Sequence, residues 1–278
     1  MSRVVESRSP ERLRAHYEIE RELADRLRAG SFEERSTLYT AVYEELFERV
    51  PDHPQLTWVE DEATRTAMVD KQLSLLEPFL GPRISFLEIG AGDCALSAAI
   101  AKRTSGEVHA IDVSETIMSV SDLPANVILH VTDGREMPVP PGSIDVAYSN
   151  QLLEHLHPDD ALIQTRNVYA AVRPGGAYVC ITPNRLTGPH DISAYFDDHP
   201  TGFHLREYTT GDLRDLFREA GFSRIRSIVP LPGRVVVIPA LPLILMERLL
   251  DALPRGLGRR IARGTPLGRL LGRVVAFR

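Results

Sequence analysis

Short apolar runs alternate with helical segments through most of the chain after residue 82. The runs predict strands at 84–90, 107–111, 126–131, 143–149, 177–182, 223–229 and 273–277. Helices are predicted between them, beginning near residues 94, 114, 159 and 211. This alternation is typical of an α/β fold in which helical crossovers connect a doubly wound, mostly parallel sheet.

Residues 1–82 have a helical pattern instead. Charged side chains dominate 11–28, and Ser31 followed by Glu34 is a capping-box sequence that predicts a second helix through Arg49. A third helix is predicted over 61–79. We therefore divide the chain into an N-terminal helical cap, 1–82, and an α/β domain, 83–278.

The first predicted strand runs into a glycine-containing corner, Glu88-Ile-Gly-Ala-Gly-Asp93, and a helical segment follows it. In a doubly wound sheet, glycines at such a corner let the backbone approach a nucleotide-like cofactor. The third glycine of the dinucleotide pattern is missing from this corner. The second predicted strand ends at Asp112, twenty residues after Gly92, where a carboxylate can take both ribose hydroxyls of an adenosine.

Four blocks in this order resemble class I S-adenosylmethionine-dependent methyltransferases, over about residues 84–229. The blocks are the corner itself, the 111–114 segment, the 132–134 segment with 144–158, and 172–183. The resemblance implies a seven-stranded sheet whose last strand is antiparallel, with S-adenosylmethionine as the cofactor. It implies cofactor contacts from Glu88, Gly90, Ala91, Gly92, Asp112, Val113, Thr132, Asp133, Gly134, Asn150 and Gln151.

The methyl acceptor is expected on the other side of this cofactor. Methyl transfer requires alignment and often removal of a proton from the acceptor, so His155 and His204 are the predicted catalytic residues. The alternative for His155 is a histidine that only shapes the pocket wall. Residues 184–208 are predicted to be a substrate lid rather than a charged, solvated loop, because long loops at this edge are usually functional.

The N-terminal helices have two interpretations. In the resembled family such helices often cover the substrate side of the cofactor pocket, and the alternative is packing against the sheet. The predicted substrate contacts from the cap and the lid are Tyr39, Tyr43, Arg185, His190 and Tyr195, and Trp58 is a further candidate.

A divalent metal is a minority hypothesis. Some members of the resembled family carry Glu-x-x-Glu-His and a later His that together bind a metal, and here Glu154, His155 and His204 occupy similar positions. However, Gln151 replaces the first glutamate, which removes a charged oxygen ligand. We therefore expect no metal, with His155 and His204 acting as base and orienting group.

Composition sets the broad class. A chain of 278 residues with 43% hydrophobic residues suits one large α/β domain with an added cap. The first 28 residues are dense in Arg and Glu and have no secretory pattern. Cys94 and Cys180 suit buried thiols in a reducing compartment. We expect a cytoplasmic protein.

Charge is distributed unevenly along the chain. The formal net charge is −6, yet from Arg224 onward eleven arginines face only Glu247 and Asp251, a balance of +9. The remainder carries 21 basic and 36 acidic residues, for a balance of −15. An acidic catalytic domain argues against a nucleic-acid substrate, because phosphate contacts supply much of the affinity in such complexes.

The basic residues concentrate in a predicted helical insertion, 230–271, before the last strand. Its apolar run, 235–246, is interrupted by prolines and is too short to span a bilayer. Residues 240–271 could instead lie at a membrane interface as basic amphipathic helices, and the alternative is a solvated basic face.

The sequence therefore predicts an S-adenosylmethionine-dependent methyltransferase that modifies an oxygen of a small molecule, such as a sugar, a secondary metabolite or a lipid-linked intermediate. One alternative is RNA 3′-end methylation with a metal site. Another is a non-catalytic protein that keeps the cofactor fold and docks to a membrane or a protein through its basic segment. The acceptor and the oligomeric state stay open at this stage.

Overall fold

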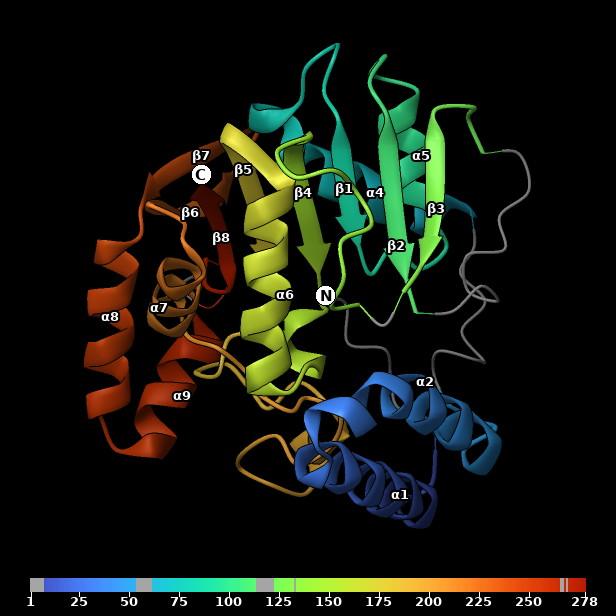
Figure 1. Ribbon diagram of the computed structural model, residues 1–278. Coiled ribbons are helices and arrows are strands. Elements are labelled where there is room, and N and C mark those ends of the chain that lie inside the picture. Colours follow the sequence, from blue (N-terminus) through green and yellow to red (C-terminus); the bar gives the residue numbers. More distant parts are fainter. Residues whose placement is uncertain (1–7, 54–61, 114–122, 133, 266–267, 269) are drawn as a thin grey trace.

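The computed structural model describes residues 8–53, 62–113, 123–132, 134–265, 268 and 270–278. Within these residues eight strands form one sheet, in the order β3-β2-β1-β4-β5-β8-β6-β7 (Figure 1). The strands are β1 (Phe86–Ile89), β2 (Val108–Asp112), β3 (Val127–Val131), β4 (Ile144–Asn150), β5 (Val172–Ile181), β6 (Arg224–Leu231), β7 (Arg234–Pro239) and β8 (Arg273–Phe277).

The predicted α/β architecture is confirmed. Strands β1 to β5 pair in parallel, and β8 inserts antiparallel between β5 and β6. The strand at Arg273–Phe277 therefore has the orientation that the sequence predicted.

The eighth strand, β7, was not predicted, and it corrects the picture of 230–271 as a helical insertion. Leu231 pairs with Arg234 across a two-residue turn, Pro232-Gly233. Gly233 has a φ of +73°, which suits the third position of a type II turn after proline. The β-branched run that follows pairs antiparallel with β6, so the insertion begins as a hairpin.

Helices cover both faces of the sheet. They are α1 (Pro10–Ala29), α2 (Phe32–Arg49), α4 (Glu62–Leu76), α5 (Ala95–Ala101), α6 (Pro158–Ala171), α7 (Thr210–Ala220), α8 (Leu241–Ala252) and α9 (Arg255–Gly264). Short 3-10 turns occur at Glu77–Phe79, Leu153–His155 and Ile192–Tyr195. The helix predicted to begin near residue 114 falls in 114–122, outside the described residues.

Alternation along β1 shows how the two faces are built. Leu87 and Ile89 pack in the core beneath α6 and α7, whereas Phe86 packs with α4 and α5. Strand side chains point alternately to the two faces, so one apolar run supplies both cores. The result is a three-layer arrangement with the sheet in the middle (Figure 1).

The N-terminal helices lie in two different places. Helices α1 and α2 lie beyond the carboxyl ends of the parallel strands (Figure 1). The predicted capping box of Ser31 and Glu34 is present at the start of α2. Helix α4 instead packs on the sheet, where Leu73 and Leu76 join the core that contains Phe86.

A buried ion pair fixes α2 to the α/β domain. The Arg35 guanidinium donates to both carboxylate oxygens of Asp160, at 2.6 and 2.9 Å, and the Tyr39 hydroxyl donates to one of them at 2.7 Å. Asp160 is fully buried on α6. Burial alone would raise the pKa of Asp160, but the hydrogen bonds from Arg35 and Tyr39 hold that pKa below its usual value.

No helix in the described part of the chain is both long enough and apolar enough to cross a bilayer.

Asp160→Ala is expected to destabilise the protein strongly, because it leaves the Arg35 guanidinium buried without its partner. We expect the free energy of unfolding to fall by about 3–5 kcal/mol, measured by urea denaturation followed by circular dichroism. The control is Asp159→Ala, at the residue next to Asp160 in the sequence. The Asp159 side chain is 75% exposed, so this substitution should cost less than about 1 kcal/mol. Equal losses in the two variants would contradict the assignment.

Candidate functional site

The turn after β1 has the backbone conformation of a ligand-binding corner. Gly90 and Gly92 have φ angles of +74° and +53°, which side-chain-bearing residues rarely adopt. A Cβ added at Gly92 would meet no heavy atom within 4 Å, so the backbone there is open to an approaching group. Ala91, between them, is buried.

Asp112 closes this corner from the end of β2. Its carboxylate accepts from the backbone N–H groups of Gly92, at 2.8 Å, and Val113, at 2.7 Å. Each carboxylate oxygen has a second lone pair that can accept a ribose hydroxyl. The geometry therefore suits the role that the sequence predicts for Asp112.

Glu88 lies on the opposite side of the glycine turn. Burial raises its pKa to about 8, although the Ser97 hydroxyl donates to it at 2.5 Å. At neutral pH the Glu88 carboxyl is therefore largely protonated, and it can donate a hydrogen bond as well as accept one. Glu88, Gly90, Ala91 and Asn150 line one pocket of about 130 Å³. A pocket of this size holds only part of a nucleoside-sized ligand.

Helix α4 supplies the outer wall of this pocket through Arg65, Met68 and Gln72. Arg65 pairs with Asp93 at 2.7 Å across the glycine turn. Gln72 accepts from the Tyr148 hydroxyl of β4 at 3.0 Å. Sequence reasoning missed these residues, because nothing in the pattern of α4 distinguishes the end that faces the cofactor corner from the end that packs on the sheet.

The other predicted cofactor residues lie along the same edge. Thr132 donates its backbone N–H to the carbonyl of Asp112 at 3.1 Å, and its hydroxyl accepts from the N–H of Gly134 at 3.0 Å. Gln151 has a left-handed backbone, with a φ of +55°, and an exposed side chain. Asp133 lies outside the described residues.

His155 follows β4 and lies beneath the cap. Its Nδ1 is 3.1 Å from the carbonyl oxygen of Phe203 and 3.2 Å from the Tyr43 hydroxyl. A carbonyl oxygen only accepts, so the contact with Phe203 places the ring hydrogen on Nδ1 and leaves a lone pair on Nε2. Burial, reinforced by the charge of His204, lowers the pKa of His155 to about 3, so its ring is neutral at physiological pH.

Tyr43, on α2 of the cap, contacts His155. Burial raises the pKa of its hydroxyl, and the charges of Glu20, Glu154 and Asp112 raise it further. The Tyr43 ring also packs against the ring of Phe203 in the lid, with 4.9 Å between the ring centroids. Of the five predicted substrate contacts, Tyr43 is the one that touches His155.

Glu154 is the unusual group in this cluster. It is fully buried, one of its oxygens accepts from the Thr182 hydroxyl at 2.9 Å, and Oε1 has no hydrogen-bond partner. Burial raises the pKa of Glu154 to about 7. A buried carboxyl with an unpartnered oxygen is a candidate for chemistry.

His204 is held by a second buried carboxylate. Its Nδ1 donates to Oε1 of Glu207 at 2.8 Å, and Nδ1 of His190 lies 3.2 Å from the same oxygen. Burial opposes ionisation of Glu207, but its bonds to His190 and His204 bring its pKa down to about 2. The ionised Glu207 in turn raises the pKa of His204, although burial alone would lower it.

Glu154, His155 and His204 could also hold a divalent cation. One nitrogen of each histidine and one oxygen of Glu154 all lie within 4.8 Å of one another. Both histidines have Nδ1 anchored by an acceptor, which leaves Nε2 as the ligating atom, an arrangement typical of metal-bound histidine. The unpartnered Oε1 completes a nitrogen and oxygen donor set that fits a transition-metal ion or zinc. The donor set therefore fits a cation even though Gln151 stands where a glutamate would.

Four predicted substrate contacts have other roles in the structure. Tyr39 bonds to Asp160 and accepts from the N–H of His157, and it is buried. Arg185 pairs with Asp251 of α8 at 3.0 Å. His190 supports Glu207, and Tyr195 is 56% exposed on the outer surface of the lid. The partners of Tyr39 and Arg185 lie 121 and 66 residues away in the sequence, so residue type alone could not reveal them.

The predicted lid is a packed segment rather than a solvated loop. On the cap side, Glu20 accepts from the Phe203 N–H at 2.9 Å, and Arg28 donates to the carbonyls of Thr201 and Gly202 at 3.0 Å. Phe203 and His204 are buried. The lid therefore encloses the His155 cluster together with α1 and α2.

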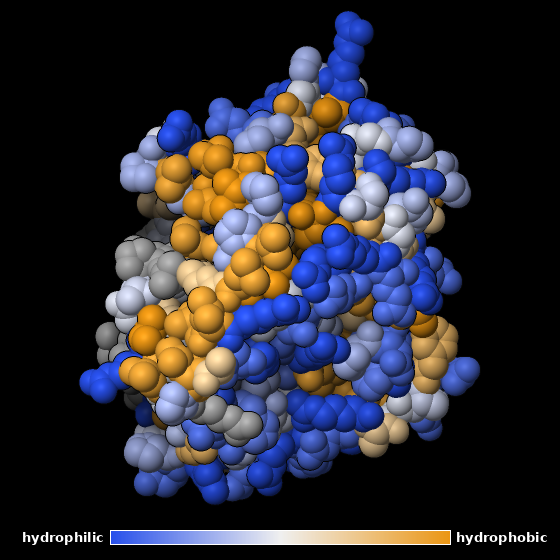
Figure 2. All heavy atoms as spheres, turned by 90° about the vertical axis from the view of Figure 1, so that its left-hand side faces the viewer, coloured by the Kyte–Doolittle hydropathy of each residue, from blue (hydrophilic) through white to orange (hydrophobic). Residues whose placement is uncertain are grey.

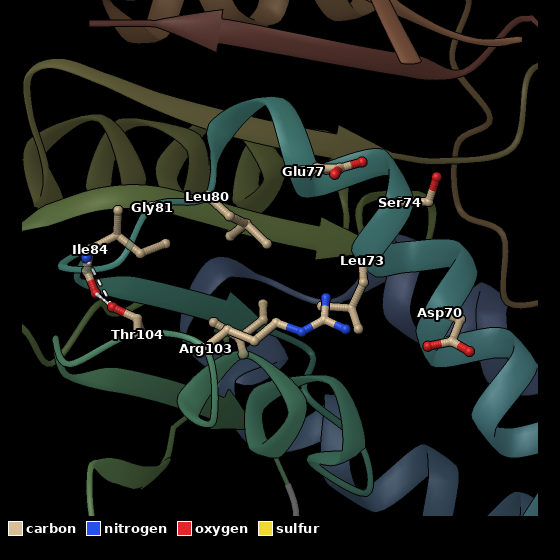
Figure 3. Close-up of a pocket in the computed structure, with 10 residues that line it drawn as sticks. Asp70, Leu73, Ser74, Glu77, Leu80, Gly81, Ile84, Arg103 and Thr104 are labelled. Carbon is tan, nitrogen blue, oxygen red and sulfur yellow. Dashed lines mark hydrogen bonds between the residues drawn. The ribbon is translucent and has the colours of Figure 1, made fainter. Parts of the chain in front are cut away.

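A larger hollow of about 420 Å³ lies away from this chemistry. Residues of α4, such as Asp70 and Leu73, line one side, and Arg103 and Thr104, which follow α5, line the other (Figure 3). It borders Ile84, before the start of β1, and so lies toward the amino end of the strands. Open α/β sheets bind their ligands at the carboxyl end, so we assign the functional site to the Asp112 and His155 edge.

Comparisons with known proteins agree with this geometry. A family model described as "Methyltransferase domain" matches residues 86–176. A probable S-adenosylmethionine-dependent methyltransferase of Mycolicibacterium smegmatis is 31% identical over 140 residues, which cover 49% of this chain and 51% of that protein. The ubiquinone biosynthesis O-methyltransferase of Ruegeria pomeroyi is 27% identical over 171 residues, which cover 56% of this chain and 66% of that protein.

Structural similarity extends over more of the chain. A chain from the complex between the Haloferax volcanii Trm112 methyltransferase activator and a putative methyltransferase aligns with a TM-score of 0.53 and 16% identity. The alignment covers 79% of this chain and 99% of that one. At this identity the likeness concerns the fold alone.

The fold of the described residues is the Rossmann-like fold of class I methyltransferases. Residues 86–176 are a methyltransferase domain of the S-adenosylmethionine-dependent family, and S-adenosylmethionine is the cofactor of that domain. The chain spans about half the length of the first relatives that it matches.

Asp112→Ala is expected to weaken cofactor binding. A hydrogen bond to a charged group contributes about 1.5–3 kcal/mol, so the dissociation constant for S-adenosylhomocysteine should rise about tenfold or more. Isothermal titration calorimetry measures this, with circular dichroism to confirm folding. Glu107→Gln, just before the other end of β2, is the matched control and should leave affinity unchanged. Unaltered binding by the Asp112 variant would remove Asp112 from the site.

The donor set of Glu154, His155 and His204 predicts that metal-free protein takes up a zinc ion. We expect His204→Ala to reduce zinc affinity about tenfold to a hundredfold, measured by competition with a chromogenic chelator. His157→Ala, at the start of α6, is the control and should bind zinc as the parent protein does. If the parent takes up no zinc, the cluster serves only as an acid–base group.

Proposed function

We propose that this chain transfers a methyl group from S-adenosylmethionine to a hydroxyl oxygen of a small molecule. The observation that carries the proposal is the buried Glu154 carboxyl, which has a pKa of about 7 and an unpartnered Oε1 beside neutral His155. A hydroxyl acceptor must lose its proton during transfer, and a base is most effective when its pKa is near the working pH.

The proposed reaction is an in-line displacement. The acceptor oxygen forms a bond to the methyl carbon while the bond from that carbon to the sulfonium sulfur breaks, which releases S-adenosylhomocysteine. The acceptor proton passes to Oε1 of Glu154, 3.9 Å from Nε2 of His155. His155 is too weak a base for this step, with a pKa of about 3, so we assign it to accepting a hydrogen bond from the acceptor and orienting it. A cation bound to the same three residues would instead lower the pKa of the acceptor hydroxyl.

Enclosure supports a small acceptor. The cap and the lid cover the His155 cluster, with α1 holding the backbone of 201–203. The similarity to an enzyme named as a ubiquinone biosynthesis O-methyltransferase supports oxygen as the methylated atom. The acidic balance of the chain up to residue 223 disfavours the RNA alternative.

Glu154→Gln tests the proposal. The deprotonated carboxylate is the active form of the base, so kcat/KM of the parent should rise with pH through about 7 and then level off. The glutamine variant should lose about a hundredfold or more of kcat and lack this rise. The measurement is S-adenosylhomocysteine release in the presence of EDTA, with phenols, sugars and polyprenyl phenols screened as acceptors against amines.

Glu136→Gln, an exposed acid on the loop after β3, is the control and should retain the parent's profile. If amines alone are methylated, the oxygen assignment is wrong. The protein could bind S-adenosylmethionine yet methylate none of these acceptors and no compound in hydrolysed extracts. That result would favour the non-catalytic alternative.

A further inference from the structure

An apolar stripe runs along the outer face of α8. Leu241, Leu245 and Leu249 follow one another at intervals of four residues, so their side chains lie on one face of the helix. All three are at least half exposed, and Leu249 reaches 71%. Leu257 on α9 is also exposed. Figure 2 faces the side of the molecule on which α8 lies, and hydrophobic side chains form a continuous band there.

Arginines accompany the stripe. Arg248 adjoins Leu249, and Arg260 lies one turn beyond Leu257 on α9. Both are exposed, and neither forms an ion pair with a residue that the structure describes. The neighbouring acids do not neutralise them, because Glu247 is buried and Asp251 pairs with Arg185. The surface is therefore cationic, although the chain as a whole carries a net charge of −6.

Glu247 shows that the inner face of α8 is already occupied. Its carboxylate accepts from the Asn184 side chain at 2.8 Å and from the hydroxyl and N–H of Thr210, at 2.7 and 3.0 Å. Leu250 packs inward against Leu186 and Ala262. The exposed leucines are thus not the core-facing side of α8. The core-facing side is the one that carries Glu247 and Leu250, and its contacts hold the helix in place.

We propose that the leucine stripe of α8 and the arginines beside it dock the protein on an anionic lipid bilayer. Leucines on one helix face with arginines at its border match the acyl and headgroup layers of a membrane surface. Because the chain carries a net charge of −6, its cationic side favours one orientation at an anionic surface. This docking does not depend on the proposed reaction.

Docking would place the lid beside the membrane. Arg263 of α9 donates to the carbonyls of Thr187 and Gly188, and Arg259 pairs with Asp198 at 3.2 Å. With the Asn184 bond to Glu247, α8 and α9 hold both the start and the middle of the lid. A lipid-dissolved acceptor could then reach the lid without crossing the aqueous phase.

Vesicle flotation with the full-length chain tests the proposal. We expect binding to vesicles of phosphatidylcholine mixed with phosphatidylglycerol, weak binding to phosphatidylcholine alone, and a loss of binding at high salt. Leu245→Glu with Leu249→Glu should reduce partitioning about tenfold or more, and Arg248→Glu with Arg260→Glu should reduce it on anionic vesicles. Both pairs lie on the surface, and thermal unfolding checks that they fold.

Two controls match these changes. Leu129→Glu places a charge at an exposed leucine of β3, and Arg83→Glu reverses an exposed arginine before β1. Each should partition as the parent does. Binding that survives the α8 variants would overturn the proposal. A second result would also overturn it: the parent protein fails to bind vesicles and is a dimer in light scattering, and the leucine variants are monomers. A second copy of the chain would then cover the stripe.

Discussion

Buried carboxylates hold together the segments that lie at the carboxyl ends of the parallel strands. A carboxylate removed from water must be given donors, or it stays protonated. Asp160 on α6 takes its donors from α2, and Glu20 on α1 takes one from the lid. Glu207 gathers two histidines within the lid, and Glu247 on α8 binds both ends of the segment 184–210. Asp160, Glu20 and Glu247 thus join helices to segments with which those helices share no strand pairing.

Glu154 differs from these acids, and the proposed reaction rests on this difference. Glu207 accepts hydrogen bonds from two histidines and is ionised. Glu154 accepts one hydrogen bond from a hydroxyl, and its Oε1 has no hydrogen-bond partner. Their pKa values lie at about 2 and about 7. Two carboxyl groups separated in this way can take different protonation states at one pH, which is the usual basis for dividing structural and proton-transfer roles. Glu207 also has an unpartnered oxygen, but a Cβ at Gly188 would collide with it, so that oxygen is packed against the backbone.

The sequence predicted what depends on local pattern. Alternating apolar runs located the strands β1 to β6 and β8, and the acids and glycines at strand ends predicted a cofactor corner whose backbone geometry suits that role. The sequence did not predict β7, because the residues from Val235 onward form one continuous apolar run with no visible strand end. The turn at Gly233 separates this run from β6. Nor could the sequence predict that Tyr39 and Arg185 are occupied by Asp160 and Asp251, since those contacts join elements more than sixty residues apart. The sequence suggested Glu154 only as a metal ligand. The small number of hydrogen-bond donors around its carboxyl group is a property of the folded core and cannot be seen in the sequence.

Helix α8 contacts the lid on its inner side and exposes leucines on its outer side. Its inner side carries Glu247, whose donors include Asn184 at the start of the lid, and its outer side carries the leucines. Breaking the Asn184 contact would leave Glu247 buried without one of its donors, which costs free energy. The helix that exposes the leucines is therefore the same helix whose inner face anchors the start of the segment that packs against His155.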